Sequence, residues 1–114
     1  MNNTVDLKQL EKEFKECKAV LSAIGDETRQ LIILCLMNGT FPGMRVGEIT
    51  KRVNLSRPAV SHHLKVLKDA KVVNMIKQGT MNFYHINPAT SDLNLLKELF
   101  SHIEESMFEC WNRE

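Results

Sequence analysis

One stretch of the chain, residues 55–65, constrains the fold more than any other. It reads Leu-Ser-Arg-Pro-Ala-Val-Ser-His-His-Leu-Lys. Ser56 is a favourable helix N-cap, because its hydroxyl accepts a hydrogen bond from a backbone N–H of the first turn. Pro58 fits that first turn, where its missing N–H costs little. The stretch therefore predicts a helix over residues 57–70.

The predicted helix 57–70 has two chemically different sides, because successive side chains lie about 100° apart around a helix. The side expected to pack on a core carries Ala59, Val60, His63, Leu64, Leu67 and Ala70. The opposite side carries Arg57, Ser61, His62, Lys65 and Lys68. A helix that packs through one face and presents cations and hydrogen-bond donors on the other is typical of the helix that enters the major groove of DNA.

The charge distribution supports this interpretation, although the net charge of the chain is only +1. Residues 43–85 contain 8 Lys and Arg and 2 Asp and Glu, a net charge of +6, whereas residues 1–42 carry −1 and residues 86–114 carry −4. The basic segment coincides with the predicted helix. A basic middle between acidic flanks therefore indicates a DNA-facing element rather than a chance surface patch.

The segments on either side of this helix complete a recognisable arrangement. Residues 47–53 are predicted to form a short helix and residues 54–56 a tight turn, so that residues 47–70 form a helix-turn-helix. The hydrophobic period then changes, and residues 72–86 favour two strands, 72–77 and 81–86, joined through Gln78-Gly79-Thr80. Such a hairpin is a wing, and we expect Lys77 and Gln78, with Thr80 and Asn82, to reach phosphates or the minor groove.

Three further helices are predicted. Residues 5–23 carry a near-heptad apolar seam of Leu7, Leu10, Phe14, Cys17, Leu21 and Ile24. Residues 29–37 are apolar nearly all round, which predicts a central core helix. A last helix ends near Trp111 and has a wide apolar face opposite Glu98, His102, Glu105 and Glu109. Wide apolar faces at both ends of a small chain predict that segments 1–24 and 91–111 pair and build a two-fold dimer.

The predicted fold class is mainly α with a small β-hairpin (α+β), in the order α-α-α-α-β-β-α, as one winged helix-turn-helix domain over residues 1–114. Lys and Glu among the first residues argue against a signal peptide, and no apolar run reaches membrane-spanning length. Three separated cysteines favour a reducing cytoplasm over a disulfide scaffold. Without a Gly-rich phosphate loop, a nucleophile elbow or paired catalytic carboxylates, the sequence does not predict an enzyme.

Several of these segments together resemble the ArsR/SmtB winged-helix repressors. Residues 23–29, Ala-Ile-Gly-Asp-Glu-Thr-Arg, are similar to the entry motif of that family, with Glu27 where proline is usual. Residues 55–67 resemble its recognition signature, and residues 77–79 and 82–86 resemble its wing. The resemblance implies a homodimeric, cytoplasmic bacterial repressor that binds an imperfect inverted repeat in double-stranded DNA and leaves it when an inducer binds.

Many members of that family sense metals, so the residues at the ligand positions of the family decide whether this chain has such a site. A Cys-x-Cys pair of the family aligns with Arg45 and Gly47, which supply no thiolate. At a second family site Asp92 is present, but the remaining positions hold Asn94, Glu105 and Phe108. We therefore predict no metal and no cofactor. The acidic and histidine face of the last helix is either a divalent-ion site or a solvated face.

Cys17 and Cys110 raise a separate alternative, because both lie on apolar seams that are expected to meet. Some relatives in the resembled family sense arsenite, oxidants or sulfur species through thiols on the terminal helices. The two cysteines are therefore either buried small hydrophobes or a thiol switch, redox or arsenite-sensing, formed within or between subunits.

The sequence assigns roles to the residues expected at DNA. Phosphate neutralisation is expected from Lys51, Arg52, Lys65, Lys68 and Lys77. Base edges are expected to be read by Arg57, Ser61 and His62, where Arg57 is suited to a bidentate guanine contact and equally to a phosphate. His63 is expected to make a structural hydrogen bond. The competing hypothesis is a winged-helix module that binds protein and not DNA, against which the basic face argues.

Overall fold

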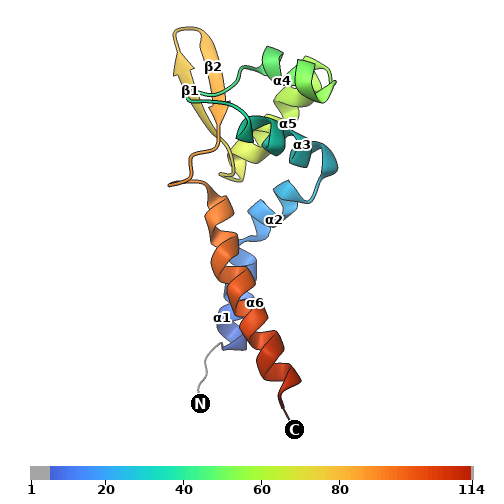
Figure 1. The fold of residues 1–114 in the computed structure, drawn as a ribbon. Coiled ribbons are helices and arrows are strands. Elements are labelled where there is room, and N and C mark those ends of the chain that lie inside the picture. Colours follow the sequence, from blue (N-terminus) through green and yellow to red (C-terminus); the bar gives the residue numbers. More distant parts are fainter. Residues whose placement is uncertain (1–5, 114) are drawn as a thin grey trace.

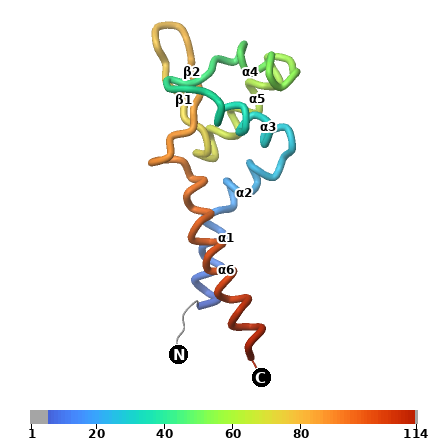
Figure 2. Tube along the Cα trace, in the orientation of Figure 1, coloured from blue at the N-terminus to red at the C-terminus, as the bar shows by residue number. Residues whose placement is uncertain are grey.

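Two helices from opposite ends of the chain lie side by side and form an elongated stalk, and the remaining elements pack at one end of it (Figure 1). The structure is a computed structural model in which residues 6–113 are described, and it measures 60 × 25 × 21 Å. The tube in Figure 2 shows the first and the last of the described residues at the far end of the stalk. The elements are α1 (Leu7–Glu16), α2 (Lys18–Ile24), α3 (Glu27–Met37), α4 (Val46–Val53), α5 (Arg57–Asp69), β1 (Asn74–Gln78), β2 (Met81–His85), a 3-10 turn (Asp92–Asn94) and α6 (Leu95–Trp111).

The predicted fold class is confirmed, with one difference in the first helix. Residues 5–23 were expected to form a single helix, but within the described residues the chain bends at Cys17, which ends α1 and precedes α2. The predicted seam implies that the whole of segment 5–23 packs on one surface. In the structure α1 packs along α6, whereas α2 packs on α3 and α5. Two separate packing surfaces require two helices.

Polar side chains cap the starts of the helices, and the cap predicted at Ser56 is among them. The Asp26 carboxylate accepts from the N–H of Arg29 at 2.9 Å at the start of α3, and the Ser56 hydroxyl accepts from the N–H of Ala59 at 3.3 Å at the start of α5. Ser91 is buried and has two roles, because its hydroxyl donates to the Val72 carbonyl at 2.8 Å and accepts from the N–H of Leu93. These local bonds fix where each helix starts.

The core of the molecule lies under α5. The fully buried side chains of this core come from α3, α4, α5 and the segment after α5, and they are Ile32, Ile49, Val60, Leu64, Leu67, Val72 and Val73. The expectation that α3 is buried nearly all round is wrong on one face. Ile32 and Leu36 are buried, but Leu34 is 61% exposed, and Leu31 and Met37 are exposed as well.

The wing is shorter than predicted. Residues 72 and 73 were expected in the first strand, but their N–H groups both donate to the Leu67 carbonyl and close the C-terminus of α5. Lys71 takes a left-handed conformation (φ 62°) in this turn. Since the amides of Val72 and Val73 are already used, β1 begins only at Asn74.

The hairpin is tied to the chain that precedes α4. β1 and β2 pair antiparallel with Gln78 opposite Met81, and Gly79 turns the chain at φ 64°. Met44 forms an isolated bridge to Tyr84 in β2, with two backbone hydrogen bonds of 2.8 Å. Gly43 permits this approach, because a Cβ atom there would lie 2.2 Å from the Tyr84 carbonyl oxygen. No helix within residues 6–113 is long and apolar enough to cross a membrane.

Candidate nucleic-acid interface

The two predicted sides of α5 are present in the structure. Val60, Leu64 and Leu67 are fully buried, and Ala70 is buried just after the helix. The opposite face is exposed along its whole length, and it carries Arg57, Ser61, His62, Lys65 and Lys68. The helix therefore presents a continuous polar face to solvent while its apolar face holds it on the core.

The turn between α4 and α5 sets the angle at which this face is presented. Asn54 ends α4 in a left-handed conformation (φ 57°, ψ 49°), and its N–H donates to the Thr50 carbonyl. An asparagine tolerates this conformation better than most residues. Two residues later Ser56 caps α5, so the helix-turn-helix geometry follows from local backbone chemistry.

A hollow of about 400 Å³ separates α4, α5 and the wing. Three cationic side chains line it, Arg45, Lys51 and Arg57, together with the Glu48 carboxylate. The wing contributes Thr80 and Asn82. Glu48 is already engaged at the start of α4, where its Oε1 accepts from the N–H of Arg45 at 3.1 Å. The hollow therefore has an excess of positive charge at a point where three elements meet.

The remaining predicted DNA contacts are more dispersed. Arg52 follows Lys51 in sequence but lines a different hollow, with Leu31 and Leu34 of α3. Lys65 is exposed and pairs with Asp69 at 2.8 Å, and this pairing raises the pKa of Lys65. Lys68 lies exposed on α5, and Lys77 and Gln78 lie exposed where β1 ends. The structure thus brings Lys51 and Arg57 together but places Arg52 elsewhere.

The two adjacent histidines have different surroundings. His63 is partly buried, and its Nδ1 accepts from the Arg29 guanidinium at 3.3 Å. Arg29 also donates to the Ala23 carbonyl at 2.7 Å, so it links α2, α3 and α5. The expected structural hydrogen bond of His63 is confirmed. His62 is exposed on the polar face of α5 and is free to contact a ligand there.

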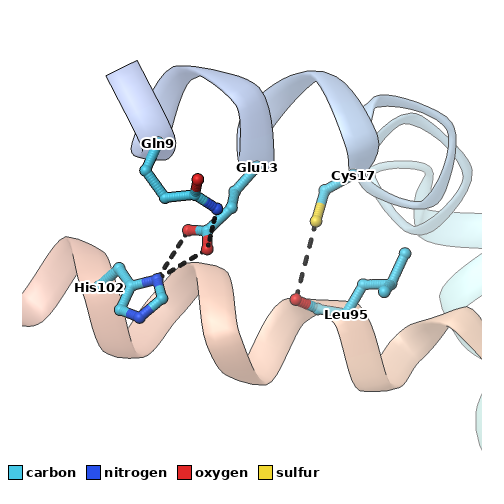
Figure 3. Close-up of polar contacts among 5 residues, drawn as sticks. All are labelled: Gln9, Glu13, Cys17, Leu95 and His102. Atoms are coloured by element: carbon cyan, nitrogen blue, oxygen red, sulfur yellow. Dashed lines mark hydrogen bonds and ion pairs between the residues drawn. The ribbon is translucent and has the colours of Figure 1, made fainter. Parts of the chain in front are cut away.

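The two thiols proposed as a switch are separated within one protomer. Cys17 is buried, and its thiol donates to the Leu95 carbonyl at 3.7 Å, at the start of α6 (Figure 3). Burial raises the pKa of this thiol. Cys110 is exposed and lies fifteen residues further along α6, about 22 Å at the helical rise per residue. A pairing within one subunit is therefore not formed, and the pairing between subunits remains a prediction.

The acidic face of α6 is not a uniformly solvated stripe. His102 is turned towards α1, where its Nδ1 lies 2.8 Å from the Glu13 carboxylate (Figure 3). Glu13 is not part of the predicted apolar seam, yet it is buried. In the part of the chain that is described, no group of three His, Cys, Asp or Glu side chains is arranged to hold a metal ion.

Sequence reasoning missed two features of this molecule. Arg45 was considered only as a position where a metal ligand is absent, yet it lines the basic hollow. The local signal was available, because Arg45 lies in the most basic segment of the chain. The Glu13–His102 contact joins residues that are 89 positions apart, and no local pattern indicates such a pair.

The comparisons with known proteins agree with this geometry. Residues 26–75 match the family described as "Bacterial regulatory protein, arsR family". The chain is 38% identical over 68 residues to the transcriptional repressor SdpR of Bacillus subtilis, covering 60% of this chain and 72% of that protein.

Solved structures show the same fold. An ArsR-like transcriptional regulator from Rhodococcus sp. RHA1 superimposes with a TM-score of 0.73 at 25% identity, covering 86% of this chain and 85% of the other. A homodimeric winged helix-turn-helix DNA-binding domain from Mycobacterium bovis has a TM-score of 0.63 at 22% identity, covering 100% of this chain and 99% of the other. The predicted resemblance is confirmed: this chain belongs to the arsR family of bacterial regulatory proteins.

Proposed function

We propose that this protein is a sequence-specific DNA-binding transcriptional repressor, which acts as a homodimer and leaves its operator on an inducing signal. The observation that carries the proposal is the exposed polar face of α5, presented at one end of the molecule next to the wing, which carries Lys77 and Gln78. A helix of this kind fits the major groove, and a hairpin beside it reaches the adjacent backbone.

The role proposed for each residue follows from its position and its charge. Ser61 and His62 lie on the exposed face in the first half of α5 and read base edges. Lys51, Lys65, Lys68 and Lys77 neutralise phosphates and supply sequence-independent affinity, whereas Arg52, in the hollow beside α3, takes no part in this contact. Gln78 contacts the backbone or the minor groove from the wing, and Ser56 serves the site by fixing the start of α5.

The stalk supplies the proposed dimer surface. α1 packs on α6 through its Glu13 and Cys17 side, which leaves Leu7 and Phe14 of the seam exposed. They border an apolar groove of about 720 Å³ with Met107 and Trp111 of α6, and Trp111 is 85% exposed. An apolar surface of this kind on a small protein favours burial against a second copy. A two-fold dimer would present two α5 helices to an imperfect inverted repeat.

The test uses the full chain and a fluorescent duplex obtained by repeated selection from a random-sequence library. We expect the selected duplex to bind more tightly than a scrambled duplex of the same composition. We also expect log K to fall linearly as log salt concentration rises, because bound phosphates release counterions. Failure to retain any duplex at low salt would contradict the proposal and favour a protein-binding winged helix.

A further inference from the structure

We propose that the basic hollow between α4, α5 and the wing holds one backbone phosphate of bound DNA. Its principal ligand is Arg57, and Gly47 is the position that keeps the Arg57 guanidinium there. This inference rests on the proposed DNA-binding function. It changes the role of Arg57, for which the sequence leaves a guanine contact and a phosphate contact equally open.

The Arg57 guanidinium lies against Gly47 at the start of α4. A Cβ atom built on Gly47 would lie 2.8 Å from Nη2, 3.4 Å from Cζ and 3.6 Å from Nη1 of Arg57. The guanidinium therefore rests against the backbone of the first turn of α4, in space that any side chain at position 47 would occupy. Arg57 is the first residue of α5, but its guanidinium lies beside the first turn of α4.

The hollow has an excess of positive charge. Arg45 and Lys51 line it beside Arg57, and Glu48 is the only acidic residue among its lining residues. Within residues 6–113, none of these three cations forms an ion pair with a carboxylate within 4.0 Å. Three cations against one carboxylate leave an excess of two positive charges for a ligand to neutralise.

The excess of cations in the hollow favours a phosphate over a base as the ligand. A base edge offers neutral hydrogen-bonding groups and gives no reason for three cations to gather. A phosphodiester carries a full negative charge and oxygens that match the paired N–H groups of a guanidinium. Thr80 and Asn82 line the opposite side of the hollow and provide polar groups from the wing. The helix-turn-helix and the wing would thus hold the same phosphate, which fixes their register on the duplex.

The experiment measures fluorescence anisotropy of the selected and scrambled duplexes with Arg57→Ala, over a range of salt concentrations. We expect both affinities to fall by a similar factor, on the order of tenfold, and the salt slope to decrease by about one. Lys97→Ala is the charge-matched control, because Lys97 is exposed on the stalk. A loss confined to the selected duplex, with an unchanged salt slope, would overturn the inference in favour of base recognition.

Gly47→Ala tests whether Gly47 positions the Arg57 guanidinium. Its Cβ meets only the flexible end of Arg57, and alanine is favoured over glycine within a helix, so this variant should unfold at or above the wild-type temperature. We expect it to weaken both duplexes about equally, and to have no further effect in an Arg57→Ala background. Additive losses in the double variant would show that Gly47 does not act through Arg57.

A methylphosphonate scan locates the ligand. In each duplex one phosphate is replaced by a neutral group, and one position should weaken wild-type binding but not the binding of Arg57→Ala. If replacing each phosphate by a neutral group weakens the binding of wild type and of Arg57→Ala by the same factor, the phosphate assignment is wrong even though DNA binding stands. If wild type binds no duplex at all, the proposed function itself has failed, so the two failures are distinguishable.

Discussion

The Nδ1 atom of His102 lies 2.8 Å and 2.9 Å from the two carboxylate oxygens of Glu13, and this contact joins α6 to α1 across the stalk (Figure 3). The Gln9 amide donates to the same carboxylate at 3.3 Å. The hydrogen bond to His102 lowers the pKa of Glu13, and the same bond raises the pKa of His102. Glu98 and Glu105 on α6 add to the rise in the His102 pKa.

The first prediction is a pH dependence of the stalk. The contribution of His102 is complete below its ordinary pKa of 6.5 and is lost as pH rises through its raised value. The contribution of Glu13 is complete above 4.5 and is lost as pH falls through its lowered value. The difference in thermal midpoint between wild type and His102→Gln should therefore be largest between these two values and should shrink at higher pH.

Scanning calorimetry at one fixed protein concentration measures this difference, because dimer stability depends on concentration. Lys97→Gln is the control, since Lys97 is exposed on the same helix. A difference between wild type and His102→Gln that stays constant from pH 5 to pH 9 would contradict the prediction.

The second prediction concerns the stalk surface. Met107→Asp places a charge in the exposed apolar groove between α1 and α6, where burial of an unpaired carboxylate is costly. We expect the variant to sediment as a monomer at concentrations where wild type is a dimer, and to bind the selected duplex more weakly. Glu105→Ala, on a different face of α6, should leave the sedimentation unchanged. A dimeric Met107→Asp protein would place the interface elsewhere.

The third prediction separates base recognition from phosphate contact. Ser61→Ala and His62→Ala should weaken the selected duplex and leave the scrambled duplex within about twofold, because they remove contacts to base edges. A lost base contact costs about 1–3 kcal/mol of discrimination. Lys51→Ala should weaken both duplexes and reduce the salt slope by about one. The same anisotropy titrations measure all three variants, and equal losses on both duplexes for Ser61→Ala would refute its role.

The fourth prediction concerns the support of α5. Leu64 is fully buried on the face opposite the exposed polar side chains of α5. Leu64→Ala should lower the free energy of unfolding by about 2–5 kcal/mol, because it removes buried methyl groups and leaves a cavity. Urea denaturation measures the loss. Lys68→Ala, exposed on the same helix, should change stability by less than about 0.5 kcal/mol. A comparable loss for both would contradict the observed burial.

The fifth prediction concerns the thiols. Disulfide-bonded cysteines have Cα atoms within about 7 Å of each other, and Cys110 lies about 22 Å along α6 from the contact between Cys17 and Leu95. A thiol switch using both residues must therefore join two protomers. Oxidation should then give a covalent dimer on a non-reducing gel, absent in Cys17→Ser and in Cys110→Ser. Equal operator binding by reduced protein, oxidised protein and Cys17→Ser would exclude the switch.

The local features of the fold could be predicted because they depend on neighbouring residues. Ser56 and Pro58 define the start of α5, and the spacing of Val60, Leu64 and Leu67 defines its buried face. The features that could not be predicted depend on distant packing. The chain bends at Cys17, between α1 and α2, because the two halves of the seam pack on different helices. β1 begins two residues later than predicted because the N–H groups of Val72 and Val73 donate to the Leu67 carbonyl.

The candidate site likewise combines local features that could be predicted with features that depend on distant packing. The exposed face of α5 follows from periodicity, and its residues were identified from sequence. The grouping of Arg45, Lys51 and Arg57 depends on how α4 and α5 cross and on where the wing lies. Adjacent positions in sequence can lie in different hollows, as Lys51 and Arg52 do, because neighbouring helical side chains point about 100° apart.

The backbone bridge between Met44 and Tyr84 has a mechanical consequence. Because β2 is bonded to the segment leading into α4, two backbone hydrogen bonds couple the position of the wing to that of the helix-turn-helix. In the proposed dimer each protomer would therefore present its wing and its α5 helix to the duplex together. Since successive major grooves on one side of a duplex recur about every 34 Å, the separation of the two α5 helices would decide whether both fit the operator at once.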